Sequence, residues 1–390
     1  MPLRLSAPAR HAAFLAAAYA GIGVTMPFLP PFLAGRGLEP EAVAAVLFAG
    51  SATRFLAGPP LGRLAERLGD ARRLLIPAGL AAGLAAMIWA PAHGFLAVLA
   101  VQILFAFSIA PIGPVGEALA LAAAREARVE YGKVRAPGSV AFILGSLLAG
   151  WLANRLGYDA MPWLLGACYL ATAFAAWALP RRLAPGRATE RAVPLGLAAR
   201  LRRGFGLHLM RHPGFARMIL LTALIQGSHA AYYGFGSIHW ARAGHSADTI
   251  GLLWAVSVAA EVALLWWAQP LLGRLSPVAL TVIAAVAGLV RWTGLAITTE
   301  LAVLVVLQPL HALTFGAQYM AAMRWLSTHA PAGEQLSAQS LYAALGNVAA
   351  MAAATLLAGA LFAHLGAGAF LMGTAMCAAA LVLTRGWRAG

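Results

Sequence analysis

Charged residues are scarce in this 390-residue sequence. Asp, Glu, Lys and Arg together make up 11% of it, whereas 61% of the residues are hydrophobic. The mean hydropathy is +0.78. A soluble domain of this length does not have enough interior to bury so much apolar surface. The scarcity of charge therefore excludes an ordinary soluble protein.

Cysteine is also nearly absent, and the two that exist, Cys168 and Cys377, both lie in apolar runs. Two isolated cysteines provide neither a disulfide framework nor a metal cluster. We expect both to behave as small hydrophobic residues. The sequence predicts no metal and no cofactor.

Long apolar runs dominate what is present. A helix needs roughly 20 apolar residues to cross a bilayer core, and the sequence predicts twelve such transmembrane helices. The predicted spans are 11–33, 41–62, 74–91, 94–116, 136–156, 160–180, 215–239, 247–270, 278–298, 300–322, 336–360 and 365–384. We expect residues 11–33 to be the first span and not a cleavable signal peptide.

One segment interrupts this pattern and divides the spans into two sets of six. Residues 181–214 are rich in arginine and contain Pro185, Pro194 and Pro213. We predict an N-terminal six-helix bundle at 1–180, a cytoplasmic linker at 181–214 and a C-terminal six-helix bundle at 215–390. The fold class is therefore an all-α membrane protein.

Basic residues give the chain a formal net charge of +15. Most of them fall in alternate loops, on the side that also holds both termini, whereas Arg36, Arg155 and Arg242 fall on the other side. This asymmetry follows the positive-inside rule and places both termini in the cytoplasm. We therefore expect a multi-pass protein of the bacterial inner membrane whose partner is the lipid bilayer and not nucleic acid.

Charges inside predicted spans are expensive, at about 2.5–3.5 kcal/mol on insertion scales, and usually functional. The sequence has four of them, within or at the edges of spans: Arg54, Glu117, Glu261 and Arg291. Glu117 ends the fourth predicted span and Arg135 opens the fifth, so a hairpin can bring them together, either to bind substrate or only to orient the hairpin. For Glu261 we expect Arg291 as partner, with His311 as the alternative.

Two spans carry polar stripes whose spacing places their members on one helical face. The stripes are Gln226, His229 and Tyr233 in the seventh predicted span and Gln308, His311, Thr314 and Gln318 in the tenth. They predict a shared water-filled cavity, with interhelical hydrogen bonding as the alternative. Because a histidine beside a carboxylate can titrate near neutral pH, His311 and Glu261 have the parts of a proton site.

Several stretches resemble a known family. They are 62–69, 131–142, 226–235, 253–262, 290–292, 310–315 and 321–324. The first is similar to the loop signature of the major facilitator superfamily, with Glu66 where Asp is usual. The others resemble the 3-phenylpropionate/cinnamate transporter group of that superfamily, a branch near the lactose-permease type of proton symporter. The resemblance implies the major facilitator fold.

The resemblance also implies residue roles. For substrate recognition they are Glu117, Arg135 and Phe142, and for proton coupling Glu261, Arg291 and His311. Thr314 stands where the branch has an acid, so Glu261 or Glu117 must carry more of any coupling. From the residues themselves we add Arg54 as a cation for a substrate carboxylate. The polar stripes add four further substrate-binding candidates, which are Gln226, His229, Tyr233 and Gln318.

The predicted function is secondary active transport, with proton-coupled uptake of a small organic acid such as 3-phenylpropionate or a related aromatic acid. Proton symport of a sugar or nucleoside, and efflux of a drug or metabolite, are the alternatives. An enzyme is not expected, because the sequence has no metal or nucleophile cluster and no additional soluble domain. The predicted partners are a small-molecule substrate and protons, and we expect a monomer.

Overall fold

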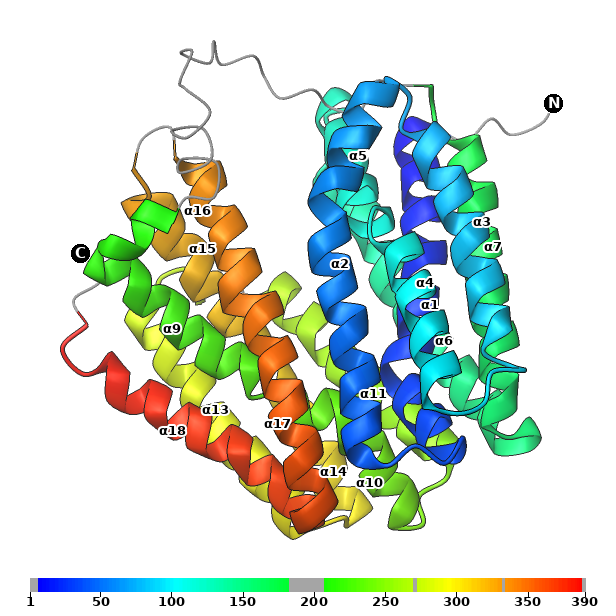
Figure 1. Ribbon diagram of the computed structural model, residues 1–390. Helices are drawn as coiled ribbons and strands as arrows, with labels where there is room; N and C mark the ends of the chain where they lie inside the picture. Colours follow the sequence, from blue (N-terminus) through cyan, green and yellow to red (C-terminus); the bar gives the residue numbers. More distant parts are fainter. Residues whose placement is uncertain (1–5, 182–206, 269–271, 332–333, 388–390) are drawn as a thin grey trace. The chain divides into compact units, whose positions relative to one another are not determined.

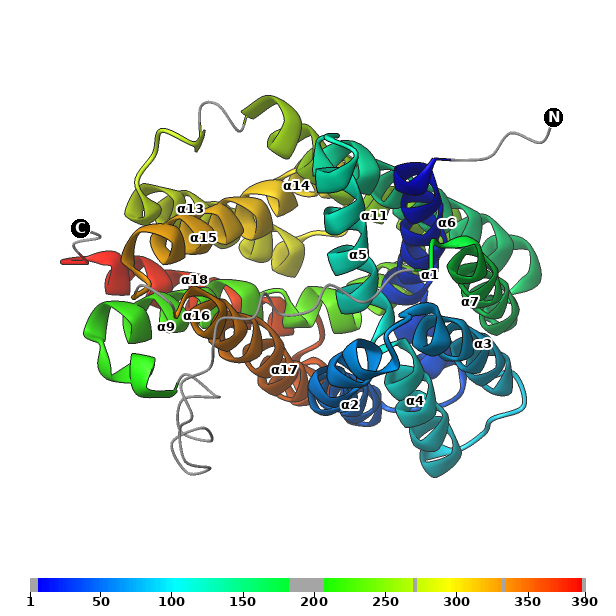
Figure 2. The ribbon, with the colours of Figure 1, turned by 90° about the horizontal axis from the view of Figure 1, so that it is seen from above.

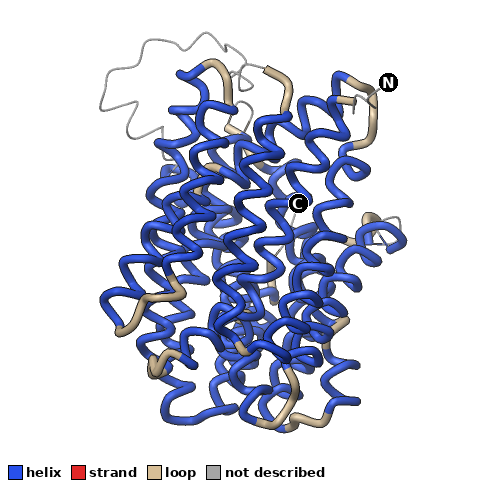
Figure 3. Tube along the Cα trace, turned by 90° about the vertical axis from the view of Figure 1, so that its right-hand side faces the viewer, coloured by secondary structure: helices blue, strands red, loops and turns tan. Residues whose placement is uncertain are grey.

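The computed structural model describes residues 6–181, 207–268, 272–331 and 334–387. In these residues the regular secondary structure is entirely helical, without strands (Figure 3). Hydrocarbon offers backbone groups no hydrogen-bond partners, so a chain that crosses it must satisfy them within helices. The predicted all-α class is confirmed.

The contacts within the chain divide it into two units. Unit 1 consists of Met1–Glu190 with Trp240–Ala255, and unit 2 of Arg191–His239 with Val256–Gly390. The sequence did not anticipate that Trp240–Ala255 would group with unit 1. The predicted linker lies mostly outside the described residues, and the domain boundaries remain a prediction.

Unit 1 contains seven long helices, drawn blue to green in Figure 1. They are α1 (Ala7–Gly35), α2 (Pro40–Leu68), α3 (Arg72–Ile88), α4 (Phe95–Ile109), α5 (Ile112–Glu126), α6 (Tyr131–Leu156) and α7 (Met161–Ala178), with a 3₁₀ turn η1 (Tyr158–Ala160) before α7. Helix α1 packs on α6 and α7, and α3 packs on α7, as the view from above shows (Figure 2). Helices α4 and α5 form one bent span, since only Ala110 and Pro111 separate them.

Unit 2 is built from shorter helices that are joined through π-helical turns. Its α-helices are α9 (Pro213–Gly227), α13 (Pro277–Ile297), α14 (Leu301–Leu307), α15 (Gln318–His329), α16 (Gln335–Leu341), α17 (Ala350–Leu365) and α18 (Phe370–Thr384). Two further helices contribute to both units, α10 (Ser237–Arg242) and α11 (Ala247–Ala263). The short 3₁₀ turns are η2 (Leu207–Arg211) and η7 (Gly366–Ala369). Helix α13 lies beside α18 (Figure 1).

Four π-helical segments occur in the described residues, all of them in unit 2. They are η3 (Tyr232–Gly236), η4 (Leu264–Ala268), η5 (Ala312–Ala317) and η6 (Tyr342–Ala349). Such turns are rare and frequently mark functional sites. Segment η3 contains Tyr233 of the first predicted stripe. Segment η5 begins directly after His311 of the second stripe and contains Thr314.

Grouped by continuity, the described helices follow the twelve predicted spans. By length and composition alone, eight helical stretches in the described residues can cross a membrane. Eight stretches are fewer than the twelve predicted spans for two reasons. Some spans are short or interrupted, and the stretch Ser337–Thr384 contains two spans that meet at Gly366. One boundary was predicted wrongly: α5 continues to Glu126, so Glu117 lies within the helix and not at its end.

Helices α1 and α6 approach each other closely through two glycines. A Cβ atom on Gly23 would lie 2.2 Å from the Phe142 carbonyl oxygen, and one on Gly145 would lie 2.5 Å from the Ala20 carbonyl oxygen. Neither position has room for a side chain. The contact fixes α6, which carries Arg135 and Phe142, against α1.

Arginine side chains cap the ends of spans in both units. In unit 1, Arg10 donates to the Ala178 carbonyl at the end of α7. In unit 2, Arg217 donates to the carbonyls of Leu383 and Arg385 at the end of α18. In each unit the first helix is thus tied to the last by a cation at the negative end of a helix dipole.

The loop after α2 turns at a glycine and is held by an ion pair. Gly69 ends the helix with a φ of +68°, a conformation that glycine adopts without strain. Asp70 then forms an ion pair with Arg72 at 2.9 Å. Hydrogen bonds from Arg72 lower the pKa of the Asp70 carboxyl. In unit 2, Arg324 donates to the carbonyls of Gly273 and Leu275 in the corresponding loop.

Candidate functional site

Unit 1 contains a compact charged cluster formed by Glu117, Arg135 and Tyr19, called here the unit 1 cluster. Arg135 Nε lies 2.9 Å from Glu117 Oε1, and the two side chains are 28% and 27% exposed. Arg135 Nη1 also donates to Ser139 Oγ at 3.3 Å. The pairing expected from the hairpin is confirmed, whereas its role in substrate binding remains a prediction.

Tyr19 on α1 completes this cluster and was missed in the sequence. Its hydroxyl donates to Glu117 Oε1 at 2.7 Å, and the Arg135 guanidinium lies 3.7 Å from the centre of its ring. Such a cation–π contact restricts the arginine to one orientation. The only signal available in the sequence is an isolated tyrosine within an apolar span.

The other two unit 1 candidates have opposite environments. Phe142 is only 6% exposed, and its ring is buried in the structure. Arg54 on α2 is exposed, and among the described residues it has no ion pair or hydrogen bond. It lies within electrostatic range of the buried Tyr169 on α7. Arg54 is therefore a cation whose guanidinium can accept an anionic partner.

Unit 2 contains a second cluster around Arg291, formed with Glu261, Gln308 and His311 and called here the unit 2 cluster. Arg291 on α13 is 0% exposed. Its Nη1 lies 3.0 Å from His311 Nδ1, and its Nη2 donates to Gln308 Oε1 at 3.3 Å. The guanidinium also lies 4.4 Å from the Tyr232 ring centre. These contacts hold a cation where water cannot solvate it.

The contact with Arg291 determines the protonation of His311. A guanidinium can only donate, so His311 Nδ1 must accept and cannot carry a proton. His311 is therefore assigned as neutral, with its proton on Nε2. Nε2 points to Glu261 Oε2, 3.7 Å away. Glu261 thus meets His311, which was the alternative partner, and the imidazole separates it from the Nη1 group of Arg291, which was the expected partner.

Gln308 connects the cluster to two hydroxyl groups. Its Oε1 accepts from Ser257 Oγ at 2.8 Å and from the Tyr232 hydroxyl at 3.2 Å. Its Nε2 donates to the Leu304 carbonyl at 3.2 Å. This arrangement fixes the orientation of the amide, so that its oxygen faces Arg291.

A second histidine lies beside the cluster. His229 Nδ1 lies 3.0 Å from the Ile225 carbonyl, so this nitrogen carries the proton. Its Nε2 lies 3.0 Å from the Thr314 hydroxyl. The His229 ring meets the His311 ring edge-on, with centroids 5.4 Å apart. His229 and Thr314 therefore hold His311 in place, and the two histidines are assigned opposite tautomers.

The polar stripes face each other and not an open cavity. Gln318 Nε2 donates to Thr222 Oγ1 at 3.1 Å, which together with the His229–Thr314 contact corresponds to the interhelical alternative. Gln226, His229 and Gln318 are each no more than 1% exposed. The Gln226 amide has no hydrogen-bond partner among the described residues. In this structure these residues therefore contact each other, as in the interhelical alternative, and the water-filled cavity stays a prediction.

Tyr233, the aromatic member of the predicted stripe in the seventh span, keeps partial exposure. Its ring lies 5.5 Å from that of His229 and 6.2 Å from that of His311. Tyr232, Trp254 and Trp292 are at most 2% exposed. Phe315, whose ring stacks on that of His311 with centroids 5.6 Å apart, is also partly exposed, so both Tyr233 and Phe315 present aromatic surface beside the unit 2 cluster.

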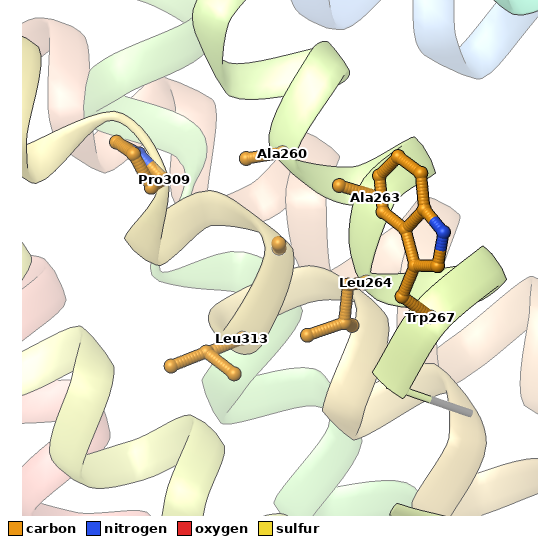
Figure 4. Close-up of a pocket in the computed structure, with 7 residues that line it drawn as sticks. Ala260, Ala263, Leu264, Trp267, Pro309 and Leu313 are labelled. Atoms are coloured by element: carbon orange, nitrogen blue, oxygen red, sulfur yellow. The ribbon is translucent and has the colours of Figure 1, made fainter. Parts of the chain in front are cut away.

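An open groove of about 500 Å³ lies between α11–η4 and α14–η5 (Figure 4). Apolar side chains line it, among them Leu264, Pro309 and Leu313, and Trp267 stands at its edge (Figure 4). Trp267 is 79% exposed. A groove without charged side chains suits contact with lipid tails and not with an anion. In the described residues no cluster of three His, Cys, Asp or Glu side chains can hold a metal.

Sequence comparison identifies relatives along nearly the whole chain. A probable 3-phenylpropionic acid transporter from Escherichia coli (strain K12) is 35% identical over 352 residues, which cover 89% of each chain. A maltose permease from Geobacillus stearothermophilus is 25% identical over 329 residues, 83% of this chain and 80% of that one.

Solved structures share the fold. The crystal structure of the nucleoside transporter NupG superposes with a TM-score of 0.80 over 98% of both chains, at 13% identity. The structure of the human organic anion transporter MFSD10 superposes with a TM-score of 0.64, over 98% of this chain and all of that one, at 17% identity. At such identities the likeness concerns the fold alone.

The model of the MFS_1 like family matches residues 10–372. This match covers every candidate site residue described above and all helices except α18, most of which lies beyond it. The 35% identical relative covers a similar share of the chain. The chain belongs to the MFS_1 like family and is a multi-pass membrane transporter of the major facilitator fold.

Proposed function

We propose that the protein is a secondary active transporter that takes up a small organic acid, such as 3-phenylpropionate or a related aromatic acid, together with protons. The observation that carries this proposal is the fully buried Arg291, joined through neutral His311 to the partly exposed Glu261. Charges inside a membrane-spanning bundle are costly and usually mark a transport pathway. The relative named as a probable 3-phenylpropionic acid transporter supports the substrate class.

The proposed coupling group is Glu261, with His311 and Arg291 as its partners. A carboxylate can change its charge by taking up a proton, whereas Arg291 stays protonated at any physiological pH. Protonation of Glu261 would therefore alter the charge balance of the unit 2 cluster and favour one conformation of the transporter over another.

Substrate recognition is proposed for residues of both units. In unit 1, Arg54 supplies a cation, the partly exposed Glu117–Arg135 pair supplies polar contacts, and Phe142 is proposed to supply an aromatic one. In unit 2, Tyr233 offers an aromatic face. Gln226, His229 and Gln318 are buried in this structure, so we propose that they contact substrate only after a conformational change.

The proposed location is the bacterial inner membrane, with both termini in the cytoplasm and the protein acting as a monomer. The distribution of basic residues between loops supports this orientation. Cysteines placed singly near each terminus and labelled with a membrane-impermeant maleimide, in intact cells and in inverted vesicles, test it. Labelling of either terminus in intact cells would contradict it.

Uptake into proteoliposomes tests the proposed function. We expect radiolabelled 3-phenylpropionate to accumulate when the outside is more acidic than the inside, and the accumulation to collapse with a protonophore. Maltose and uridine serve as the neutral comparison substrates. Accumulation that ignores the pH gradient would refute proton coupling, and transport of maltose or uridine in place of the acid would refute the substrate class.

Sugar symport is the second candidate. The observation that favours it is the Glu117–Arg135 pair, because a carboxylate and a guanidinium side by side can bind sugar hydroxyl groups in both directions. The maltose permease relative agrees with this possibility. Uptake of maltose that survives the change Arg54→Gln would support this candidate.

A further inference from the structure

Two helical stretches of unit 2 meet along a row of polar side chains, called here the polar interface. Helix α9 and the residues directly after it contribute Thr222, Gln226 and His229, and η5 with α15 contributes Thr314 and Gln318. Gln318 Nε2 donates to the Thr222 hydroxyl group at 3.1 Å. His229 Nε2 lies 3.0 Å from the Thr314 hydroxyl oxygen. These two contacts run in opposite order along the chain, so the stretches are antiparallel and the interface is closed at two points.

Gln226 lies between these two points and takes part in neither contact. It follows Thr222 by four residues and precedes His229 by three, which places it on the same helical face. Its side chain is 1% exposed, and neither its Oε1 nor its Nε2 has a hydrogen-bond partner among the described residues. Gln318 Oε1 is likewise buried and unpartnered there. Within the described residues, the polar interface thus presents one unpaired amide NH₂ group and two unpaired oxygen atoms.

Segment η6 holds one end of the polar interface in place. A Cβ atom on Gly346 would lie 3.0 Å from Thr222 Cγ2 and 3.6 Å from Tyr342 Cδ2, so η6 approaches α9 closely at this level. The methyl group of Thr222 therefore packs against η6, while its hydroxyl group accepts from Gln318. Because this contact is held from two sides, the Gln226 amide, one turn further along α9, does not share in it.

Burial makes the unpaired amide of Gln226 unfavourable. A polar group that leaves water without gaining a hydrogen bond costs free energy, and here the surrounding bundle spans a membrane. A methionine, unbranched and of nearly the same length, would fill the same space without this cost. A buried polar group of this kind requires an explanation, and in a transporter the substrate is a group that can supply the hydrogen bonds.

The chemistry of the unpaired atoms selects the partner. A hydroxyl group both donates and accepts, so one such group can donate to Gln226 Oε1 or Gln318 Oε1 while it accepts from Gln226 Nε2. A carboxylate only accepts and would meet two oxygen atoms here, and an ammonium group only donates. None of the five side chains of the polar interface is a cation, since His229 carries its single proton on Nδ1. A neutral hydroxyl group therefore fits, whereas a charged group does not.

We propose that the polar interface binds a hydroxyl group on the aromatic ring of the transported acid, and that Gln226 determines the preference for such a phenolic acid. The inference deepens the proposed function and rests on it. When the interface opens, the substrate hydroxyl group bonds to the amides of Gln226 and Gln318. Any loss of the Thr222–Gln318 contact then exchanges one neutral hydrogen bond for another, which costs little. The carboxylate of the acid binds elsewhere, because the polar interface has no cation.

Equilibrium binding to the purified full-length protein at pH 7, where a phenol is neutral, tests the proposal. The probes are 3-phenylpropionate, 3-(3-hydroxyphenyl)propionate, 3-(4-hydroxyphenyl)propionate and 3-(4-methylphenyl)propionate, in which a methyl group replaces the hydroxyl group. For the wild type we expect one of the hydroxylated acids to bind at least about tenfold more tightly than the other two kinds of acid. Gln226→Met removes the amide and should abolish this preference.

Thermal unfolding in detergent without substrate provides a second measurement. Gln226→Met should raise the Tm by about 2–4 °C, because it removes an unpaired buried amide. Gln102→Met is the matched control. It changes a buried glutamine of α4 in unit 1 and should keep the preference for the hydroxylated acid.

The outcomes separate this proposal from the proposed function. Wild-type protein that binds none of these acids would refute the proposed substrate class. Wild-type protein that binds all of them equally would refute the hydroxyl subsite and leave the substrate class intact. A preference that survives in Gln226→Met, or a folded Gln226→Met variant that binds no acid at all, would refute the selective role of this residue.

Two other partners of the amide give different results. If a trapped water molecule satisfies Gln226, the Tm of Gln226→Met should fall and the preference should not change, which would refute the proposal. If a sugar hydroxyl group is the partner, the wild type should bind maltose in place of the phenolic acids and Gln226→Met should lose this binding. That result would refute the phenolic substrate.

Discussion

The close contact between α1 and α6 leads to a quantitative prediction. Replacing Gly23 by Ala adds one methyl group, which would lie 2.2 Å from the Phe142 carbonyl oxygen. Close carbon–oxygen contacts between packed helices lie at about 3.3–3.6 Å. Because the atom it meets belongs to the backbone, no side-chain rotation can relieve the overlap. The helices must separate by roughly 1 Å at this point.

The magnitude follows from this displacement. Overpacking costs about 1–3 kcal/mol, and we expect about 2–3 kcal/mol because the overlap involves backbone. For domains of 150–250 residues, each kcal/mol lowers the Tm by roughly 2–4 °C. Gly23→Ala should therefore lower the Tm by about 4–12 °C. It should also impair uptake, since α6 carries both Arg135 and Phe142.

Thermal unfolding in detergent, followed by intrinsic tryptophan fluorescence, measures this effect. Gly35→Ala is the matched control in the same helix, because its methyl group would meet nothing within 4 Å. Gly145→Ala should resemble Gly23→Ala. The double variant should lose less than the sum of the two, because one separation of the helices relieves both overlaps. A Gly23→Ala variant as stable as Gly35→Ala would refute the reasoning.

Three further predictions follow from the described contacts. Glu117→Gln should change the free energy of unfolding by less than about 1 kcal/mol, since the pair with Arg135 is partly exposed. It should lower 3-phenylpropionate uptake by at least about tenfold, because one charged hydrogen bond is lost. Unchanged uptake would show that this pair is not part of the binding site. Arg36→Gln breaks an ion pair with Asp159 and hydrogen bonds to the carbonyls of Ala90 and Ala92 in the loop after α3. The Tm should therefore fall by about 2–4 °C, and an unchanged Tm would contradict this. Cys377 is 0% exposed and should react with maleimide only after unfolding, as mass spectrometry of the labelled protein can check.

The sequence was sufficient for features that depend on local constraints. Apolar length predicted the spans, and the short hairpin between α5 and α6 predicted that Glu117 and Arg135 would meet. It was not sufficient for Tyr19, which reaches the same pair from α1. The rotation of one helix against another depends on packing contacts such as the one at Gly23, and a periodicity within a single helix contains no information on them.

The polar stripes show a related limit. Their spacing predicted which residues share a helical face, but it could not distinguish a face that meets water from a face that meets another polar face. His229 and Gln318 turned out to be bonded to Thr314 and Thr222. Both arrangements satisfy the same hydrogen-bonding groups, so only the packing of the helices decides between them.

The π-helical segment η5 has a consequence for how such a protein can change through mutation. A π-helical turn holds one residue more than an α-helical turn. Losing a single codon within Ala312–Ala317 would leave hydropathy and span length almost unchanged. The turn would then become α-helical, and because a π-helical turn accommodates its additional residue within one turn, His311 and Gln318 would keep nearly the same relative orientation. A one-residue insertion, a small genetic step, can thus be absorbed by a π-helical turn without disturbing the alignment of His311 with Arg291.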